Sequence, residues 1–247
     1  MNSTLSTIRV GQFSESPILA VASALGLAQK YGVTWETQRV PSSPGQFGWL
    51  RDGEIDVAIT SPDNVLLYAT TDQNPLGQQL DTRLLRPIDR GLGLALYTDA
   101  RLEHLGALRG STLGVDVLNS GFALLLLRML KDAGVDASTI AFEAVGATPK
   151  RLGAITDGLV VGTILNAETA VAAEELGLRR WVTSADVSPD YLGTVLVQAG
   201  RRTTEAVERF LALWDEAATG LREIPELAAR MARVKGDVRA VLSEKAP

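Results

Sequence analysis

The sequence of 247 residues contains no cysteine and a single histidine, His104. Without cysteine there is no disulfide, thiolate metal site, iron–sulfur cluster or thiol nucleophile, and one histidine excludes a multi-histidine metal site. A Ser-His-Asp hydrolase would have to use His104, which falls in a polar connecting stretch where a surface position is expected. No EF-hand spacing, phosphate-binding loop, nucleophile elbow or complete dinucleotide fingerprint occurs. We therefore expect no metal and no cofactor.

The sequence also lacks a basic excess and a long apolar run. Lys and Arg number 24 against 29 Asp and Glu, a formal charge of −5 that does not favour nucleic acid or anionic lipid. The most apolar run, Phe122 to Leu130, is interrupted by Arg128 and is much shorter than the roughly 20 residues of a membrane span. We expect neither nucleic-acid binding nor membrane insertion. The polar residues 1–7 do not form an export signal, which predicts a cytoplasmic protein, or an exported one if a leader has been removed.

What is present is a 46% hydrophobic chain in which strand-like runs alternate with helical patterns. Near the start, the strand-like run Ile8–Phe13 is followed by a helical pattern over Pro17–Lys30 and a second strand-like run, Val33–Val40. This alternation is typical of parallel βαβ units. Towards the end, an apolar stripe from Val207 to Leu221 predicts a core-facing helix, and a stripe from Leu227 to Val241 predicts another.

An internal repeat links the two halves. Asp52-Gly53 and Asp157-Gly158 are 105 residues apart, and Ser43-Pro44 stands at the same offset from Thr148-Pro149. Val10 and Val115 also differ by 105 residues, whereas the glycines at 32 and 134 differ by 102, which indicates a length change inside one helix. The repeat predicts two lobes built on one α/β plan.

Polar loops follow the predicted strands in both halves. In open parallel sheets, ligands collect outside the carboxyl ends of the strands, near free helix N-terminal N–H groups. Helix capping by itself is an alternative explanation for these Ser, Thr and Asn residues. The ligand-binding candidates are Phe13, Ser14, Glu15, Ser16, Ser42, Ser43, Thr60, Ser61, Asp63, Asn64, Asn119, Ser120, Gly121, Phe122, Thr148, Asn166, Glu168 and Tyr191.

The order and spacing of these segments resemble the type II periplasmic binding protein fold. The similarity is to the sulfonate, nitrate, taurine and pyrimidine-precursor branch of ABC-transporter substrate-binding proteins. The similarity rests on Ile8–Phe13 with the predicted helix Pro17–Tyr31, and on Leu50–Ala58, Leu105–Val115, Arg151–Gly158 and Ala185–Gly193. The resemblance implies two α/β lobes, each a mixed sheet flanked by helices, joined by two hinge strands near Leu92–Leu96 and Leu192–Leu196. Lobe 1 is predicted over residues 1–92 plus 194–247, and lobe 2 over residues 93–193.

The resemblance implies a solute-binding protein that closes on a small molecule in a cleft between the two lobes and can serve an ABC permease. None of the loop cores carries an arginine, whereas Glu15, Asp63 and Glu168 occur there. Such a cleft suits a small polar ligand that is neutral or partly cationic, nitrogen-bearing or aromatic; a small anion held by backbone N–H groups is a further alternative.

Two other functions are compatible with the same fold. One is a cofactor-free cytoplasmic lyase, a dehydratase or decarboxylase of a small organic acid, in which burial raises the pKa of Glu15 or Glu168 for proton transfer. The other is a metabolite-sensing interaction domain. Binding without chemistry is the function that we expect.

Overall fold

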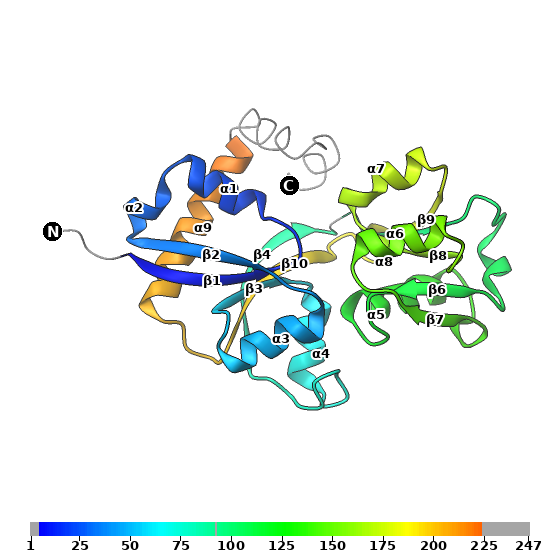
Figure 1. Ribbon diagram of the computed structural model, residues 1–247, viewed down its shortest axis with the longest axis horizontal. Coiled ribbons are helices and arrows are strands. Elements are labelled where there is room, and N and C mark those ends of the chain that lie inside the picture. The colour runs from blue at the N-terminus through cyan, green and yellow to red at the C-terminus, as the bar shows by residue number, and fades with distance from the viewer. Residues whose placement is uncertain (1–4, 92, 224–247) are drawn as a thin grey trace. The chain divides into compact units, whose positions relative to one another are not determined.

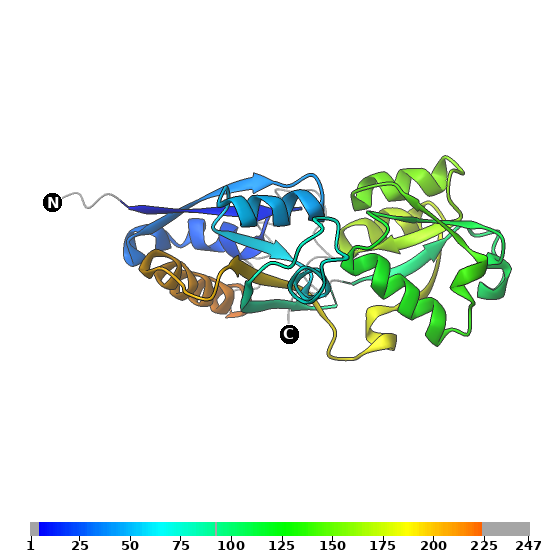
Figure 2. The ribbon, with the colours of Figure 1, turned by 90° about the horizontal axis from the view of Figure 1, so that it is seen from below.

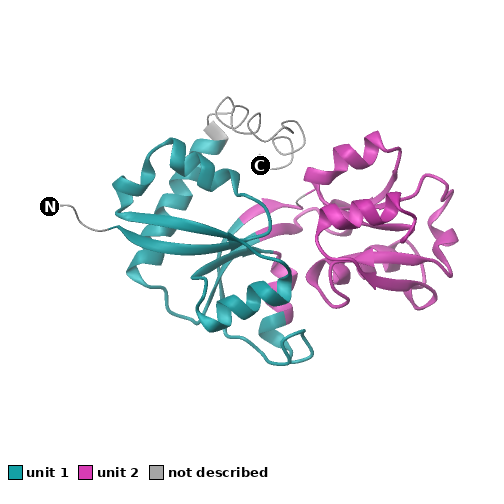
Figure 3. Cartoon of the chain, in the orientation of Figure 1, with its two compact units in different colours: residues 1–60, 68–87, 195–247 teal, residues 61–67, 88–194 magenta. Residues whose placement is uncertain are grey.

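The computed structural model describes residues 5–91 and 93–223, which form two compact units (Figures 1 and 3). Within these residues, unit 1 comprises 5–60, 68–87 and 195–223, and unit 2 comprises 61–67 and 88–194 apart from residue 92. The units depart from the predicted lobes at residues 61–67 and at a few residues around 90 and 194. The assignment of functional domains stays a prediction.

Unit 1 is built on a five-stranded sheet, sheet A, with strand order β2-β1-β3-β10-β4. Strands β1, β2 and β3 run parallel, and β10 is antiparallel to β3. The strands are β1 (Ser6–Gln12), β2 (Val33–Arg39), β3 (Val57–Thr60), β4 (Thr82–Arg90) and β10 (Leu192–Ala199). The helices are α1 (Pro17–Ala24), α2 (Leu27–Tyr31), α3 (Ser43–Asp52) and α9 (Glu205–Glu223). Helices α1 and α9 pack against each other beside β1 (Figure 2).

Unit 2 repeats this plan in sheet B, whose strand order is β7-β6-β8-β5-β9. Strands β6, β7 and β8 run parallel, and β5 is antiparallel to β8. The strands are β5 (Ala95–Thr98), β6 (Thr112–Val115), β7 (Ala141–Ala144), β8 (Gly162–Leu165) and β9 (Arg179–Thr183). The helices are α5 (Gly121–Asp132), α6 (Thr148–Thr156), α7 (Ala167–Glu175) and α8 (Ser184–Val187), with short 3-10 turns at Leu105–Leu108 and Ala137–Thr139. Helix α4 (Pro62–Thr70) begins in unit 2 and ends in unit 1.

Each unit has its own apolar core. In unit 1, Phe47 stacks on Tyr68 with ring centroids 4.0 Å apart, and Phe210 and Trp214 of α9 are buried. In unit 2, Leu113, Leu126 and Met129 are among the buried residues between α5 and sheet B. The burial of Val207, Phe210, Leu211 and Trp214 confirms the predicted core-facing helix. The second predicted stripe, Leu227–Val241, lies outside the described residues.

The repeat is real, but one of its predicted equivalences is wrong. Gly11 pairs with Ala58, and Gly114 pairs with Thr163, so the third strands of the two units match at 105 residues but the first strands match at 103. A Cβ on Gly11 would meet Val40 and Ile55, and one on Gly114 would meet Val145 and Val160, which stand at an offset of 105 from those two. Val115 is therefore not the counterpart of Val10. The length change lies after the first helix, where unit 2 has a 3-10 turn at Ala137–Thr139.

The helix predicted over Pro17–Lys30 is interrupted. Gly26 adopts a left-handed conformation with φ of 64°, which ends α1 and starts α2. An L side chain rarely adopts this backbone conformation, so glycine at position 26 supplies the break.

Candidate functional site

In unit 1, the predicted ligand residues lie at one edge of sheet A. The carboxyl ends of the parallel strands β1, β2 and β3 meet there, since parallel strands all end at the same edge. Ser42 caps α3, its Oγ accepting from Gly45 N at 3.2 Å, as the capping alternative predicts. Of the remaining candidates, Ser14 and Glu15 are exposed, Phe13 is half-buried, and Ser16, Ser43 and Thr60 are buried.

Gln46 was not predicted as a site residue, although it ties two of these strands together. Its Nε2 donates to the carbonyl oxygens of Gly11 at 3.1 Å and Ile59 at 2.9 Å, and its side chain is fully buried. The hydrogen bonds hold the ends of β1 and β3 in a fixed relation behind the loops. Gln46 is therefore a clamp that positions the edge.

In unit 2, the corresponding edge lies at the carboxyl ends of β6, β7 and β8. Ser120 caps α5 by accepting from Ala123 N at 3.1 Å, and Asn166 caps α7 by accepting from Thr169 N at 3.3 Å. Ser120 Oγ also donates to the Asp116 carboxylate. Glu168 is exposed in the first turn of α7, and Asn119, Phe122 and Thr148 are half-buried.

Arg151 is the counterpart of Gln46, 105 residues later. Its guanidinium donates to the Gly146 carbonyl at 2.8 Å, the Ile164 carbonyl at 3.1 Å and Thr148 Oγ1 at 3.2 Å. Ile59 and Ile164 are also 105 residues apart, so Gln46 and Arg151 donate to carbonyls at equivalent positions of β3 and β8. Only 2% of Arg151 is exposed, and its Nε has no hydrogen-bond partner among the described residues.

The charge of Arg151 is buried with neutral acceptors. Desolvation lowers the pKa of its guanidinium, and the charge of Asp116 offsets part of this effect. An arginine remains ionised in a protein, so unit 2 holds a positive charge directly behind its strand ends, where unit 1 has a neutral amide. The repeat offset of 105 residues in the sequence shows that positions 46 and 151 are equivalent, but their hydrogen bonds are seen only in the structure.

Three candidates from the start of α4 lie in unit 2 with Gly121 and Tyr191. Gly121 N donates to Asn64 Oδ1 at 2.8 Å, and the Tyr191 hydroxyl donates to the Asp63 carboxylate. Ser61 Oγ accepts from Asn64 N at 3.2 Å. Unit 2 therefore brings five predicted residues together.

Burial changes the pKa of both Asp63 and Tyr191, which are hydrogen-bonded to each other. Desolvation raises the pKa of the Asp63 carboxyl, and the hydrogen bond from Tyr191 offsets part of the rise. Burial, followed by the nearby Asp63 charge, raises the pKa of Tyr191. Glu15 and Glu168, the predicted catalytic candidates, are both exposed, so neither has the buried surroundings that the lyase hypothesis requires. Among the predicted site residues, Asp63 is the carboxyl whose pKa burial raises.

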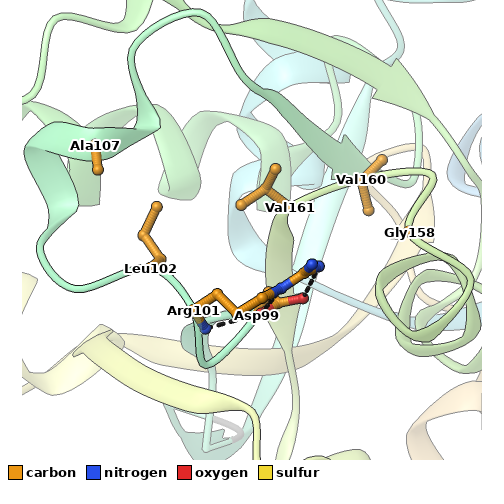
Figure 4. Close-up of a pocket in the computed structure, with 7 residues that line it drawn as sticks. All are labelled: Asp99, Arg101, Leu102, Ala107, Gly158, Val160 and Val161. Atoms are coloured by element: carbon orange, nitrogen blue, oxygen red, sulfur yellow. Dashed lines mark hydrogen bonds and ion pairs between the residues drawn. The ribbon is translucent and has the colours of Figure 1, made fainter.

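A cavity of about 360 Å³ lies elsewhere in unit 2 (Figure 4). Asp99, Leu102, Gly158 and Val161 are among its lining residues, and none of the predicted ligand residues is. It adjoins the starting end of β8 rather than the carboxyl end, because Val161 immediately precedes that strand. Arg101 at its rim is already paired with Asp99 at 2.7 Å, so this cavity offers little unused polar chemistry.

Across residues 5–91 and 93–223, no cluster of three or more metal-ligating side chains is found. No helix in those ranges is both long and apolar enough to traverse a bilayer.

No protein-family model matches the sequence, and no curated protein matches it by sequence. Solved structures do match. The alkanesulfonate-binding protein SsuA from Xanthomonas axonopodis pv. citri, bound to MOPS, is 19% identical with a TM-score of 0.76, over 96% of this chain and 82% of that one. The periplasmic aliphatic sulphonate binding protein SsuA from Escherichia coli is 18% identical with a TM-score of 0.74, over 98% and 80% of the two chains. The periplasmic nitrate-binding protein NrtA from Synechocystis PCC 6803 is 12% identical with a TM-score of 0.77, over 98% and 68%.

These similarities establish the fold. The chain has the type II periplasmic-binding-protein fold, with two mixed sheets flanked by helices, as the sequence predicts. The solved structures that share this fold include alkanesulfonate-, aliphatic sulphonate- and nitrate-binding proteins.

Proposed function

We propose that this chain is a solute-binding protein that binds one small polar molecule at the carboxyl ends of its parallel strands, without chemistry. The observation that carries the proposal is the repeated strand-end edge. In each unit, polar loops follow the carboxyl ends of three parallel strands. Buried Gln46 joins β1 to β3 in unit 1, and buried Arg151 joins β8 to the loop after β7 in unit 2. Proteins with the same fold that bind sulfonates or nitrate support ligand binding as the function.

The charges of the site residues favour a nitrogen-bearing ligand that also carries a negatively polarised group. Asp63 and Glu168 attract a positive group, whereas the buried Arg151 attracts a negative one. A small zwitterion meets both demands and is neutral overall. The half-buried ring of Phe122, in the same unit, offers apolar surface to the rest of such a molecule.

We propose further that an ABC permease receives the ligand. The support is the fold alone, since ligand-binding components of ABC import systems share it. Neither Glu15 nor Glu168 is buried, so the geometry does not favour the lyase alternative.

Native mass spectrometry of the purified protein tests the proposal by looking for a small molecule that co-purifies. A thermal-shift panel of amino acids, small amines, nitrate and the zwitterionic sulfonate MOPS then extends the search. We expect at least one compound to raise the melting temperature and to be recovered unchanged; a converted compound would identify an enzyme.

Glu168→Gln provides the matched test of the site, with Glu175→Gln at the other end of α7 as its control. Both side chains are exposed, so neither change should affect folding. We expect only Glu168→Gln to weaken binding of a nitrogen-bearing ligand, by about tenfold for one lost charge-assisted hydrogen bond. Equal affinities of the two variants would contradict this placement of the site.

A further inference from the structure

Residues 61–67 belong to unit 2 by their contacts, although the residues before and after them belong to unit 1 (Figure 3). Two hydrogen bonds with unit 2 hold this segment. Asn64 Oδ1 accepts from Gly121 N at 2.8 Å, in a buried position, and the Asp63 carboxylate accepts from Tyr191. The first turn of α4 is therefore fixed to the helix that follows β6 and to the residue that precedes β10.

The backbone at Gly121 makes this approach possible. A Cβ at position 121 would lie 2.6 Å from Ser61 Oγ, 2.7 Å from Asp63 Cβ and 2.8 Å from Asn64 N. The last of these is a backbone atom, so a side-chain rotation cannot relieve the contact. Since Gly121 is an ordinary helical residue without a positive φ, close approach explains the glycine, and conformational freedom does not.

The groups held in this way are those that a ligand would use. Gly121 N is the first N–H of the 12-residue helix α5, where the partial positive charge of a helix attracts an oxygen acceptor. Here the acceptor is the Asn64 side-chain carbonyl. Asp63 is an acceptor for a positive or hydroxyl group, and here the donor is Tyr191.

We infer that the first turn of α4 is an internal occupant of the unit 2 edge. The Asn64 carbonyl occupies the position at Gly121 N where a ligand oxygen would bind, and the Tyr191 hydroxyl occupies the position of a ligand donor on Asp63. A ligand binds by exchanging with these partners, so its measured affinity is reduced by the free energy needed to separate them. This inference rests on the proposed function for the part that concerns ligand, and on the structure alone for the contact.

Gly121→Ala tests the contact without removing any polar side chain. Alanine favours a helix, so α5 should be retained while its methyl group displaces residues 61–67. Gly153→Ala is the matched control, because it adds the same methyl to helix α6 of unit 2 with nothing within 4 Å. Tyr191→Phe removes one hydrogen bond without a steric clash, and serves if Gly121→Ala does not fold.

Hydrogen–deuterium exchange of the full chain, without ligand, measures the release. We expect the amides of residues 61–67 to exchange about tenfold faster in Gly121→Ala and in Tyr191→Phe, as loss of one hydrogen bond implies, and at the wild-type rate in Gly153→Ala. Wild-type exchange in both test variants would overturn the inference.

Calorimetry with MOPS as the probe measures the competition. We expect Gly121→Ala to bind MOPS about tenfold more tightly than the wild type, because the internal partners no longer compete. Binding that is no tighter, in a variant whose segment is released, would overturn the role as occupant. If the segment is released but no compound of the panel binds either protein, the proposed function fails while the internal contact is supported.

Discussion

Replacing Arg151 with methionine should destabilise unit 2, because it removes every donor of the clamp and keeps a side chain of comparable length. The carbonyls of Gly146 and Ile164 would each lose a hydrogen bond of 2.8 to 3.1 Å. Arg151→Gln is the informative companion. Gln46, at the equivalent position of unit 1, donates to the equivalent carbonyl at 2.9 Å, so a glutamine at 151 should recover the bond to Ile164.

The magnitude follows from two opposing contributions. A buried carbonyl left without its donor costs about 1–3 kcal/mol. The Ile164 bond is buried and the Gly146 bond only partly so, which puts the loss of both at roughly 2–4 kcal/mol. Removing a buried charge returns part of that cost, since desolvating an ion is unfavourable by several kcal/mol. Because the carbonyls remain in place and methionine cannot satisfy them, we expect a net loss of about 2–3 kcal/mol for Arg151→Met and about 1 kcal/mol for Arg151→Gln.

Hydrogen exchange measured at increasing urea gives the stability of each unit separately. Amides of β6 and β8 report unit 2, and those of β1 and β3 serve as an internal reference. Gln46→Met should reverse the pattern and destabilise unit 1. If Arg151→Met is as stable as the wild type, the cost of burying the charge exceeds the gain from its hydrogen bonds; if Arg151→Gln is no better than Arg151→Met, the two clamps are not equivalent.

Three further predictions concern single sites. Gly162→Ala should cost about 2–3 kcal/mol in urea denaturation, because its Cβ would lie 2.6 Å from the Tyr97 carbonyl oxygen, whereas a change below 1 kcal/mol would show that β8 and β5 can separate. Asp63→Asn should be more stable than the wild type at pH values above 3.8, the ordinary pKa of an aspartate. Burial raises the pKa of Asp63 in the folded state, so the wild type loses stability as the pH rises from 3.8 through that raised pKa, and the variant does not. Parallel pH profiles of the two melting temperatures would refute this. Arg101→Ala should raise the pKa of Asp99 from about 2 towards its ordinary 3.8 in a carboxyl NMR titration, since the hydrogen bond from Arg101 is its main cause, and an unmoved titration would contradict that cause.

Much of the fold was predictable because local signals agreed with long-range order. Alternating strand and helix patterns predicted the parallel strands, and the dipeptides at an offset of 105 predicted the duplicated plan. The repeat offset predicted the wrong equivalence for the first strands, because the loop lengths of the two units differ. Val10 and Val115 both look like buried strand residues, and only strand pairing shows that Gly11 corresponds to Gly114.

The candidate site was predictable in residue type but not in partners. Ser42, Ser120 and Asn166 follow strands as predicted, and all three cap helices. The pairing of Asn64 with Gly121 joins residues 57 positions apart, and nothing in either local pattern specifies it. The hydrogen bond of Asp63 likewise joins it to Tyr191, 128 residues away, whereas Glu15 and Glu168 look equivalent to Asp63 in sequence and are exposed.

The strand order of sheet A has a consequence for the order in which the nascent chain can fold. Strand β4 has only β10 as its neighbour, and β10 is made more than 100 residues later. Sheet B has all its strands by Thr183. During translation, the part of the protein encoded in the middle of the gene can therefore complete its fold first, while the part that was begun earliest must wait for the final segments to be synthesised.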